Sequence, residues 1–460
     1  MVSPNSIQTY SKLIKSSSPI FSIRTVHLDL KGAPPKIEYF RQLMPFFKSL
    51  GFDSILMEYE DMFPYSGRFE ILRTKYAYSR ETIVEILKLA EDNELEIIPL
   101  IQTFGHMEFV LKHSIFEHLR EVPSKPDTIC PSDSNSTELI HEMLQQVREL
   151  HPNSKSIHIG CDEAWHIAQD DRCLHALNTT FHNLTDQLKL AHISSIAKYA
   201  KEHLNFEHVL AWNDLFDKIP VDLLNEYKLG SYIIPIIWGY AENVTTAGYF
   251  PPGMIERYSQ VFNEMIFGSV FKGANGAMQI FVTIERYLSN LKSYLMLYIL
   301  NERILNGKVM GTVLTGWQRF WHGIQLCEIL PEGIPALVLE SMYMKDPTLD
   351  DYELENKTLE FFNCERHQLF PISYNGKLYT PRKEAIYSFC EFPGSDVYAL
   401  IEKLHLLLWK ISVSSPELYN PLREEQKQLR NEFQQALKKY FYEDTVEEFI
   451  KQNIDSIIPA

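Results

Sequence analysis

Short apolar runs alternate with amphipathic segments along the chain from about residue 20. Eight of these runs have the length of strands, and most are continuously apolar instead of alternating with polar residues. Continuous apolar runs are typical of parallel strands that are covered on both faces. The predicted strands span residues 25–30, 54–59, 96–102, 156–159, 208–212, 233–238, 265–270 and 311–314.

Helical patterns fill the intervals between the predicted strands. A helix over 37–50 should end at Gly51, and Ser79 is a suitable N-cap for a helix that runs to Asp92. Longer helices are expected over residues 137–150, 181–204 and 283–305. Eight strands, each followed by a helix, close most economically as an α/β fold of the (β/α)8 TIM barrel type. An open doubly wound sheet is the alternative, and the lack of a glycine-rich phosphate turn favours the barrel.

The pattern divides the chain into three parts. Residues 1–19 form an N-terminal extension, residues 20–345 form the barrel that would carry the chemistry, and residues 346–460 form a C-terminal helical region. The last part is polar, and its clearest helices are expected over 395–412 and 416–440. Because it carries no recognisable chemical motif, we expect it to pack against the barrel as a helical appendage.

The charge balance limits the ligands. The 460 residues include 44 Lys and Arg against 60 Asp and Glu, which gives a formal net charge of −16. Such a surface repels nucleic acid and anionic membranes unless a basic patch is set aside, and no run of Lys or Arg provides one. No stretch approaches the ~18 uninterrupted apolar residues that cross a bilayer. We therefore expect neither nucleic acid nor a membrane as a partner.

The cysteines and the glycosylation sequons give opposing indications about the cellular compartment. The six cysteines are scattered without a CxxC pair, which indicates buried reduced thiols instead of a disulfide framework or a structural zinc site. The N-terminus has no apolar segment of signal-peptide length, so an intracellular protein is expected. Five sequons leave a secretory origin open as the alternative; they begin at Asn135, Asn178, Asn183, Asn243 and Asn356.

Functional side chains of a barrel lie where its strands end. At the predicted strand ends the sequence places mainly acids, tryptophans and histidines, and it contains no GxSxG, HExxH, P-loop or dinucleotide motif. Carboxylic acids beside aromatic rings suit the hydrolysis of sugars. An acid must protonate the glycosidic oxygen, and flat rings pack on the apolar face of a pyranose.

The most informative segment is SIHIGCDEAWH, residues 156–166, in which a predicted strand leads into Asp162 and Glu163. Gly160 would let the chain leave the pleat, so that both carboxylates reach one pocket. Repulsion between them would raise at least one pKa, as a general acid at neutral pH requires. The same two residues also suit a helix N-terminus, so spacing alone leaves both interpretations open.

The run HIGCDE resembles the H-x-G-G-D-E signature of glycoside hydrolase family 20, the β-N-acetylhexosaminidases. Similar blocks keep their order through the predicted barrel: HLDLKGAPPK at 27–36, EYEDMFPY at 58–65, PLIQTFGHMEFVLKH at 99–113, FKGA at 271–274 and TGWQRFWH at 315–322. The resemblance implies a retaining exo-hydrolase without cofactor or metal that acts on amino-sugar-terminated glycoconjugates or oligosaccharides. The chain is most similar to the nucleocytoplasmic branch of the family. That similarity implies a cytoplasmic and nuclear location, a leaning towards galactosaminides, and a homodimer.

The resemblance also implies roles for individual residues. Glu163 would be the general acid and then the base, while Asp162 would hold the 2-acetamido nitrogen of the substrate. The acetamido oxygen, instead of a protein carboxylate, would attack the anomeric carbon and form an oxazolinium-type intermediate. Further side chains would bind the sugar, and they are Trp212, Trp238, Trp317, His106, Asp214, Tyr240 and Asp29. A structural role stays open for several of these, since the tryptophans and His106 also suit a barrel core and Asp214 a helix cap.

Three departures from the family pattern concern the sugar pocket. Cys161 replaces the second glycine of the signature and would narrow the pocket floor. The sugar-binding arginine of strand 1 is not in register, since Leu30, Lys31 and Gly32 follow Asp29. The tyrosine that usually holds the acetamido oxygen has no counterpart near residues 269–273, and Tyr240 is the candidate to replace it.

Other functions remain open at this point. A barrel glycosidase with a protein nucleophile would need a second carboxylate, such as Glu58, Glu60 or Asp214. A non-catalytic sugar-binding barrel would keep the tryptophan pocket without turnover, although the intact Asp162 and Glu163 argue against it. A metal hydrolase would need convergence of three histidines; the candidates are His27, His106 and His158.

Overall fold

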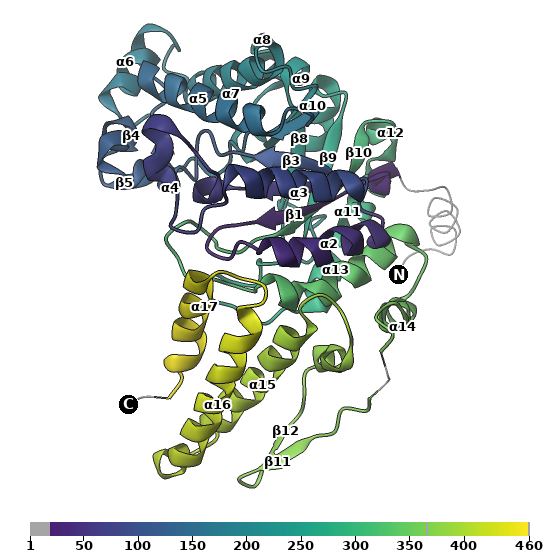
Figure 1. Ribbon diagram of the computed structural model, residues 1–460. Coiled ribbons are helices and arrows are strands. Elements are labelled where there is room, and N and C mark those ends of the chain that lie inside the picture. The colour runs from purple at the N-terminus through teal and green to yellow at the C-terminus, as the bar shows by residue number, and fades with distance from the viewer. Residues whose placement is uncertain (1–18, 365–366, 459–460) are drawn as a thin grey trace.

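The computed structural model of the chain describes residues 19–364 and 367–458. Eight parallel strands close into a barrel in the order β1-β10-β9-β8-β7-β6-β3-β2, with helices around it (Figure 1). The strands are β1 (Ile23–Asp29), β2 (Ser54–Glu58), β3 (Glu96–Leu100), β6 (Ser156–His158), β7 (His208–Trp212), β8 (Ile234–Trp238), β9 (Met265–Lys272) and β10 (Val309–Gly316). The predicted TIM barrel is confirmed, and every predicted strand end lies within two residues of the observed one.

The helices that follow the strands form the outer layer of the barrel (Figure 1). They are α2 (Ile37–Leu50), α3 (Arg80–Asp92), α5 (Ser134–Leu150), α7 (Thr185–Glu202), α8 (Val221–Glu226), α9 (Leu229–Tyr232), α10 (Met254–Val261), α11 (Ile284–Leu300), α12 (Glu302–Leu305) and α13 (Leu330–Lys345). Two shorter helices, α4 (Glu108–Leu111) and α6 (Asp171–Thr179), lie in the loops after β3 and β6.

Two apolar layers explain why the strands are apolar throughout. The inward-facing side chains form a small cluster inside the barrel, which includes Leu56, Leu100, Leu210 and Trp212. The outward-facing side chains join a much larger cluster beneath the helices. A strand between these layers has no face for water, as expected for a parallel barrel.

Capping residues determine several helix ends. Gly51 ends α2 in the left-handed conformation with φ 85°, and the Ser79 hydroxyl accepts a hydrogen bond from the backbone of Thr82 at the start of α3. Both predicted ends are confirmed. The predicted helix over 181–204 begins later, at Thr185, because His182 and Asn183 have positive φ and form a turn.

Two hairpins were missing from the predicted elements. One comprises β4 (Arg120–Val122) and β5 (Lys125–Ile129), which lie in the connection between β3 and α5. The other comprises β11 (Ile372–Tyr374) and β12 (Lys377–Tyr379) in the C-terminal region. Each strand is at most five residues long, so neither gives a clear periodic signal in the sequence.

The C-terminal region consists of α14 (Asp351–Phe361), α15 (Ser395–Ser412), α16 (Tyr419–Leu437) and α17 (Glu443–Ile450) around the second hairpin. It lies along one side of the barrel, with α15, α16 and α17 next to one another (Figure 1). The hydroxyl of Thr445 donates to the carbonyl of Gly32 at 2.8 Å, and the backbone of Lys36 donates to Tyr440 at 2.7 Å. The region thus contacts the loop after β1. The division into three domains stays a prediction, and residues 1–18 of the predicted extension lie outside the described part.

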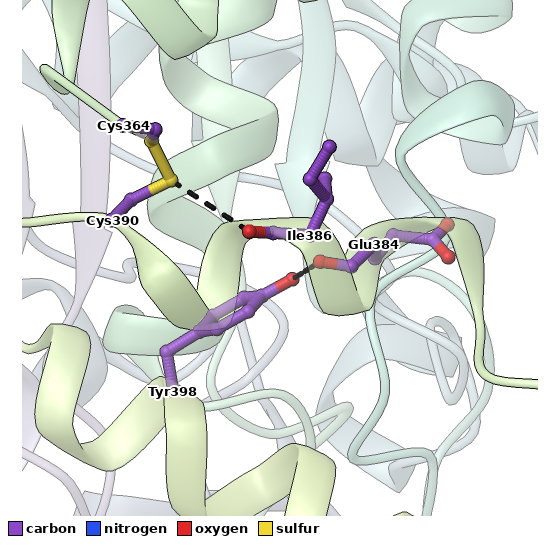
Figure 2. The surroundings of a disulfide bond; sticks show 5 residues. All are labelled: Cys364, Glu384, Ile386, Cys390 and Tyr398. Carbon is purple, nitrogen blue, oxygen red and sulfur yellow. Dashed lines mark hydrogen bonds between the residues drawn. A yellow bond between two sulfur atoms is a disulfide. The ribbon is translucent and has the colours of Figure 1, made fainter. Parts of the chain in front are cut away.

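One disulfide corrects the prediction that all cysteines are reduced. Cys364, after α14, is bonded to Cys390, with a Cα–Cα distance of 4.7 Å (Figure 2). The fold of the C-terminal region brings these residues together, although 26 positions separate them in sequence. The other four cysteines are free and buried. Within residues 19–364 and 367–458, no helix combines the length and apolarity that a membrane crossing requires.

Candidate active site

The C-terminal ends of the barrel strands surround a cavity of about 190 Å³. Its walls combine aromatic rings with carboxylates and cations. The lining residues are Lys31, Glu58, His106, Asp162, Glu163, Trp212, Trp238, Tyr240, Gly273, Ala274, Trp317, Arg319 and Phe320. Seven of the nine predicted site residues are among them, whereas Asp29 and Asp214 are not.

The acid pair follows β6 through a turn of unusual backbone conformation. Gly160 and Glu163 have φ of 64° and 45°, in the left-handed region. A Cβ at Gly160 would lie 1.9 Å from Oε1 of Gln102, so only glycine fits there. The strained conformation of Glu163 is of the kind that folds retain at functional sites. As a result of the turn, Asp162 and Glu163 both reach the cavity.

His106 lies between the two carboxylates. Its Nε2 is 3.4 Å from Oδ2 of Asp162 and 3.2 Å from Oε2 of Glu163. Burial alone would lower the pKa of His106, but the charge of Asp162 and the hydrogen bonds to both acids outweigh it and raise this pKa well above its usual value. The imidazolium therefore balances the charge of the acid pair.

Cys161 does not narrow the cavity, in contrast to the prediction. Its thiol is fully buried, lies 3.2 Å from the hydroxyl of Thr103, and is not among the groups that line the cavity. Burial raises the pKa of Cys161 to about 12, so the thiol is unreactive at neutral pH.

Three tryptophans wall the cavity from different strands. Trp212 is 1% exposed and lies at its base, with its ring centroid 5.8 Å from that of Trp317. Trp238 lies beside Tyr240 at a centroid distance of 5.2 Å. Because the rings come from different strands, they provide flat apolar surfaces on more than one side of a ligand of pyranose size. The positions of the three tryptophans in the cavity wall are therefore compatible with their predicted sugar-binding role.

Several polar atoms around the cavity have no hydrogen-bond partner among the described residues. They include Oδ1 of Asp162, the hydroxyl of Tyr240, and the indole nitrogens of Trp212 and Trp317. Buried polar atoms are normally paired. A carboxylate oxygen, a hydroxyl and two N–H donors that converge on one cavity therefore indicate a polar ligand with its own donors and acceptors.

Asp214 lies behind the cavity wall instead of lining it. Its Oδ2 accepts a hydrogen bond from the backbone N–H of Glu163 at 3.0 Å, and its Oδ1 accepts one from the indole of Trp238 at 3.1 Å. Burial and the charge of Asp162 raise the pKa of Asp214. Because both of its oxygens accept hydrogen bonds, Asp214 positions Glu163 and Trp238. It does not line the cavity, so the structure does not place it in direct contact with a sugar.

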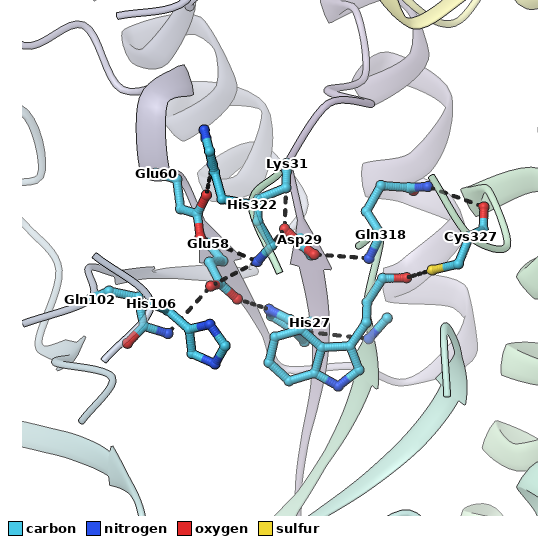
Figure 3. Close-up of polar contacts among 12 residues, drawn as sticks. His27, Asp29, Lys31, Glu58, Glu60, Gln102, His106, Gln318, His322 and Cys327 are labelled. Atoms are coloured by element: carbon cyan, nitrogen blue, oxygen red, sulfur yellow. Dashed lines mark hydrogen bonds and ion pairs between the residues drawn. The ribbon is translucent and has the colours of Figure 1, made fainter. Parts of the chain in front are cut away.

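Asp29 also lies outside the cavity, within a buried charge network shown in Figure 3. It accepts hydrogen bonds from the backbones of Lys31 and Gln318 at 3.0 and 2.8 Å. The ammonium of Lys31 lies 3.1 Å from Glu58. Although burial opposes its charge, Asp29, Glu58 and Glu60 outweigh it and raise the pKa of Lys31. Lys31, in the turn after β1, presents charge to the cavity, whereas Asp29 does not.

Glu58 lines the cavity as an ionised carboxylate whose charge is paired. Its Oε2 lies 3.1 Å from Nε2 of His27, and its Oε1 accepts hydrogen bonds from Lys31 at 3.1 Å and Gln102 at 3.4 Å (Figure 3). Burial would raise the pKa of Glu58, yet Lys31 and His27 outweigh burial and lower it. Glu58 is therefore held ionised within a network of cations and donors.

The sequence places Arg319 near the end of the last predicted strand but indicates neither a role for it nor the residue that holds it, and the structure shows that it lines the cavity. Its guanidinium forms a two-pronged ion pair with Glu448 of α17. A carboxylate from the C-terminal region thus fixes a cation at the mouth of the barrel. The two positions are 129 residues apart, and no sequence pattern connects them.

The three histidines considered for a metal are not arranged as a ligand set. Nε2 of His27 faces Glu58, and Nδ1 of His158 accepts the backbone N–H of Gly160 at 2.9 Å. Burial lowers the pKa of His158 to about 3. Within the described part of the chain, no group of three close metal-ligating atoms includes these histidines.

Comparison with known proteins agrees with this geometry. A sequence profile described as "Glycosyl hydrolase family 20, catalytic domain" matches residues 58–249. A Homo sapiens protein named Hexosaminidase D is 36% identical over 95% of this chain and 93% of its own, and a Bos taurus protein of that name is 41% identical over 69% and 90%. The solved β-N-acetylhexosaminidase of Bacteroides fragilis has a TM-score of 0.52 at 18% identity, covering 70% of this chain and 65% of that one. This structural likeness concerns the fold alone.

Proposed function

The chain belongs to glycoside hydrolase family 20, and on that premise we propose that it is a retaining exo-β-N-acetylhexosaminidase. Its substrates would be glycoconjugates or oligosaccharides that end in β-linked N-acetylgalactosamine or N-acetylglucosamine. Two relatives named Hexosaminidase D, one of them similar over 95% of this chain, support this activity. A carbohydrate also fits a cavity with aromatic walls and unpaired polar atoms.

One observation carries the proposal: Oδ1 of Asp162 is buried at the cavity without a partner among the described residues. An unpaired buried carboxylate oxygen is costly unless a ligand donates to it. The N–H of a 2-acetamido group is a donor of the right kind. Since His106 occupies Oδ2, at 3.4 Å, Oδ1 is the oxygen left for the substrate.

In the mechanism that follows, Glu163 protonates the glycosidic oxygen as the bond to the anomeric carbon breaks. The acetamido oxygen attacks that carbon, and Asp162 holds the acetamido N–H and balances the charge that develops on the oxazolinium ring. Tyr240 would donate its unpartnered hydroxyl to the acetamido group. Glu163, now a carboxylate, then takes a proton from water, which opens the ring with retention of configuration.

The carboxylates that could serve as a protein nucleophile are poorly placed for that role. Glu58 is paired with Lys31 and His27, and Glu60 with His322 at 2.7 Å. Asp214 does not line the cavity. Each would have to give up existing partners before it could attack, whereas the acetamido group arrives with the substrate.

We infer the sugar preference from Lys31, which lines the cavity beside Glu58. Lys31 offers a compact ammonium in place of the planar guanidinium that the family usually supplies from strand 1. An ammonium imposes less directional hydrogen bonding than a guanidinium. We therefore expect tolerance of either configuration at C4, with hydrolysis of galactosaminides as well as glucosaminides.

Substrate assistance is tested by inhibition. Wild-type protein should hydrolyse aryl β-N-acetylgalactosaminide and β-N-acetylglucosaminide, and a thiazoline mimic of the cyclised acetamide should inhibit competitively. Its inhibition constant should lie at least ~10²-fold below KM, as for an intermediate-like ligand. Turnover without inhibition would instead indicate a protein nucleophile, and binding of the sugar without turnover a non-catalytic barrel.

Replacement of Asp214 by asparagine should lower kcat/KM about tenfold or more, since a hydrogen bond to a charged group contributes ~1.5–3 kcal/mol. A carboxamide accepts only one of the two hydrogen bonds that Asp214 accepts, and its amino group would face the second donor. Steady-state kinetics on an aryl substrate provide the measurement. Asp217→Asn, on the same loop but outside the cavity lining, is the matched control. Unchanged kinetics in Asp214→Asn would contradict a positioning role.

Cytoplasmic and nuclear localisation and homodimerisation stay predictions. Four buried free cysteines fit a reducing compartment, while the Cys364–Cys390 disulfide is more typical of an oxidising one. The sequons keep the secretory alternative open. Fractionation of cells and peptide mapping of Cys364 and Cys390 would decide between the compartments.

A further inference from the structure

A second cluster of reactive side chains lies outside the cavity, between the loops that follow β3 and β6. Glu121 belongs to β4, Cys130 directly follows β5, and Cys173 lies in α6. These elements are neighbours at the upper left of Figure 1. All three side chains are buried, with exposed fractions of 1%, 0% and 0%, and none takes part in the proposed reaction.

The spacing of the three side chains suits one bound cation. Sγ of Cys173 lies 3.4 Å from Sγ of Cys130 and 3.2 Å from Oε2 of Glu121, and all three atoms lie within 4.8 Å of one another. Tetrahedral zinc, with Zn–S of ~2.3 Å and Zn–O of ~2.0 Å, separates two sulfurs by ~3.8 Å and a sulfur from an oxygen by ~3.5 Å. The observed spacing differs by a few tenths of an ångström. A disulfide of ~2.05 Å would instead require the sulfurs to approach by more than ~1 Å.

The carboxylate of Glu121 is oriented by the backbone of the neighbouring loop. Its Oε1 accepts hydrogen bonds from the N–H groups of Gln169 and Asp170 at 2.6 and 3.2 Å. Oε2 is thereby directed at the thiols. Outer hydrogen bonds of this kind are what fix the ligands of metal sites.

Arg172, next to Cys173 in α6, joins the segments around the cluster. It donates to Asp170 and pairs with Asp133, so the segment that carries Cys173 is joined to the start of α5.

We infer that Glu121, Cys130 and Cys173 form a binding site for a thiophilic divalent cation, and that Zn²⁺ is the ion they fit best. The two sulfurs and Oε2 supply three ligands, and a water completes the tetrahedron. Each thiol releases its proton to solvent on binding, so two protons leave for each ion. Thiolate ligands favour zinc over magnesium or calcium.

Bound zinc would join the loop that carries His106 to the loop that carries Glu163. These loops already meet where Nδ1 of His166 contacts Oδ1 of Asp127 at 2.7 Å. Both loops hold residues at positive φ, with 52° at His106 and 45° at Glu163. A further link between them would help to keep this strained arrangement, without any ligand of the ion reaching the cavity.

The test is cobalt(II) binding to the full chain with thiols kept reduced and metals removed by a chelator. We expect one equivalent of Co²⁺ per chain, with thiolate-to-metal charge transfer in the near ultraviolet and the visible bands of tetrahedral cobalt. Zn²⁺ should displace the Co²⁺ without further release of protons. Added instead to the metal-free chain, Zn²⁺ should release about two protons per ion and raise Tm by a few degrees.

Variants separate this site from other thiols. Cys173→Ala should abolish the charge-transfer band and Glu121→Gln should weaken cobalt affinity at least tenfold, while Cys327→Ser, at another buried free cysteine, should leave both unchanged. If a variant fails to fold, the wild-type titration still decides. No thiolate band in reduced wild-type protein, a band that survives in Cys173→Ala, or a Cys130–Cys173 disulfide found by mass spectrometry of the purified chain would each overturn the inference.

Discussion

Replacement of Glu163 by glutamine is expected to lower kcat/KM for alkyl β-N-acetylhexosaminides by about 10²- to 10⁴-fold, the usual contribution of a general acid–base. Glutamine has nearly the same size and can keep the contact with His106, but it can neither give a proton to the leaving oxygen nor take one from water. Since the side chain of Glu163 is 30% exposed, the variant should fold normally. Steady-state kinetics on both sugars provide the measurement.

The leaving group adds a sharper criterion for Glu163. Nitrophenolate leaves with little protonation. In Glu163→Gln, the rate of the first step should therefore fall less for nitrophenyl glycosides than for alkyl glycosides. The deficit of Glu163→Gln should therefore increase with the pKa of the leaving group. Glu242→Gln, an exposed glutamate on the loop after β8, is the matched control. Equal rates in Glu163→Gln and wild type would contradict the assignment.

The barrel was predictable because a parallel strand between two apolar layers leaves a plain signal in the sequence. The run 208–212 is apolar from Val209 to Trp212, and the structure has β7 over these same positions. The acid pair was predictable for a local reason. Gly160 directly precedes CDE in the sequence, and its φ of 64° begins the turn that directs both carboxylates into the cavity.

The partners of the predicted residues were not predictable, because they depend on loops that meet only in the folded chain. Asp214 lies just beyond the end of β7, where a sugar-binding residue is expected. Its carboxylate instead accepts a hydrogen bond from the backbone N–H of Glu163, 51 positions away. Asp29 and Lys31 are two residues apart at the end of β1, and only the structure determines which of them faces the cavity.

Two links outside the barrel strands also join residues that are distant in sequence. Glu448 holds Arg319 from a region that the sequence reasoning treated as an appendage. Cys130 and Cys173 are 43 positions apart, so a search for a CxxC pair passes over them. In both cases, an insertion or a terminal region stabilises a loop of the active site, and no periodic pattern marks that role.

Replacement of Asp162 by asparagine should lower kcat by about 10²- to 10³-fold with little change in KM, the effect expected when a group that stabilises developing charge is lost. A neutral amide can still accept the acetamido N–H, so the ground state is bound almost as before. It cannot balance the positive charge of the oxazolinium ring. The deficit should be the same for all leaving groups, which distinguishes it from that of Glu163→Gln.

Two further measurements identify Asp162 as the group that acts on the acetamide. The thiazoline mimic should lose affinity by a factor similar to the loss in kcat, because both report the charged ring.

His106 should titrate at lower pH in Asp162→Asn, since the charge that raises its pKa is gone while burial still lowers it. In the wild type, the His106 imidazolium stabilises the fold below its usual pKa, and this stabilisation is lost as pH rises through the raised value. The variant should show a weaker dependence of Tm on pH in that range, measurable by thermal melts alongside nuclear magnetic resonance of His106. Full thiazoline affinity in Asp162→Asn would contradict the acetamide contact, because a carboxylate that interacts with the cyclised ring cannot be neutralised without weakening its binding.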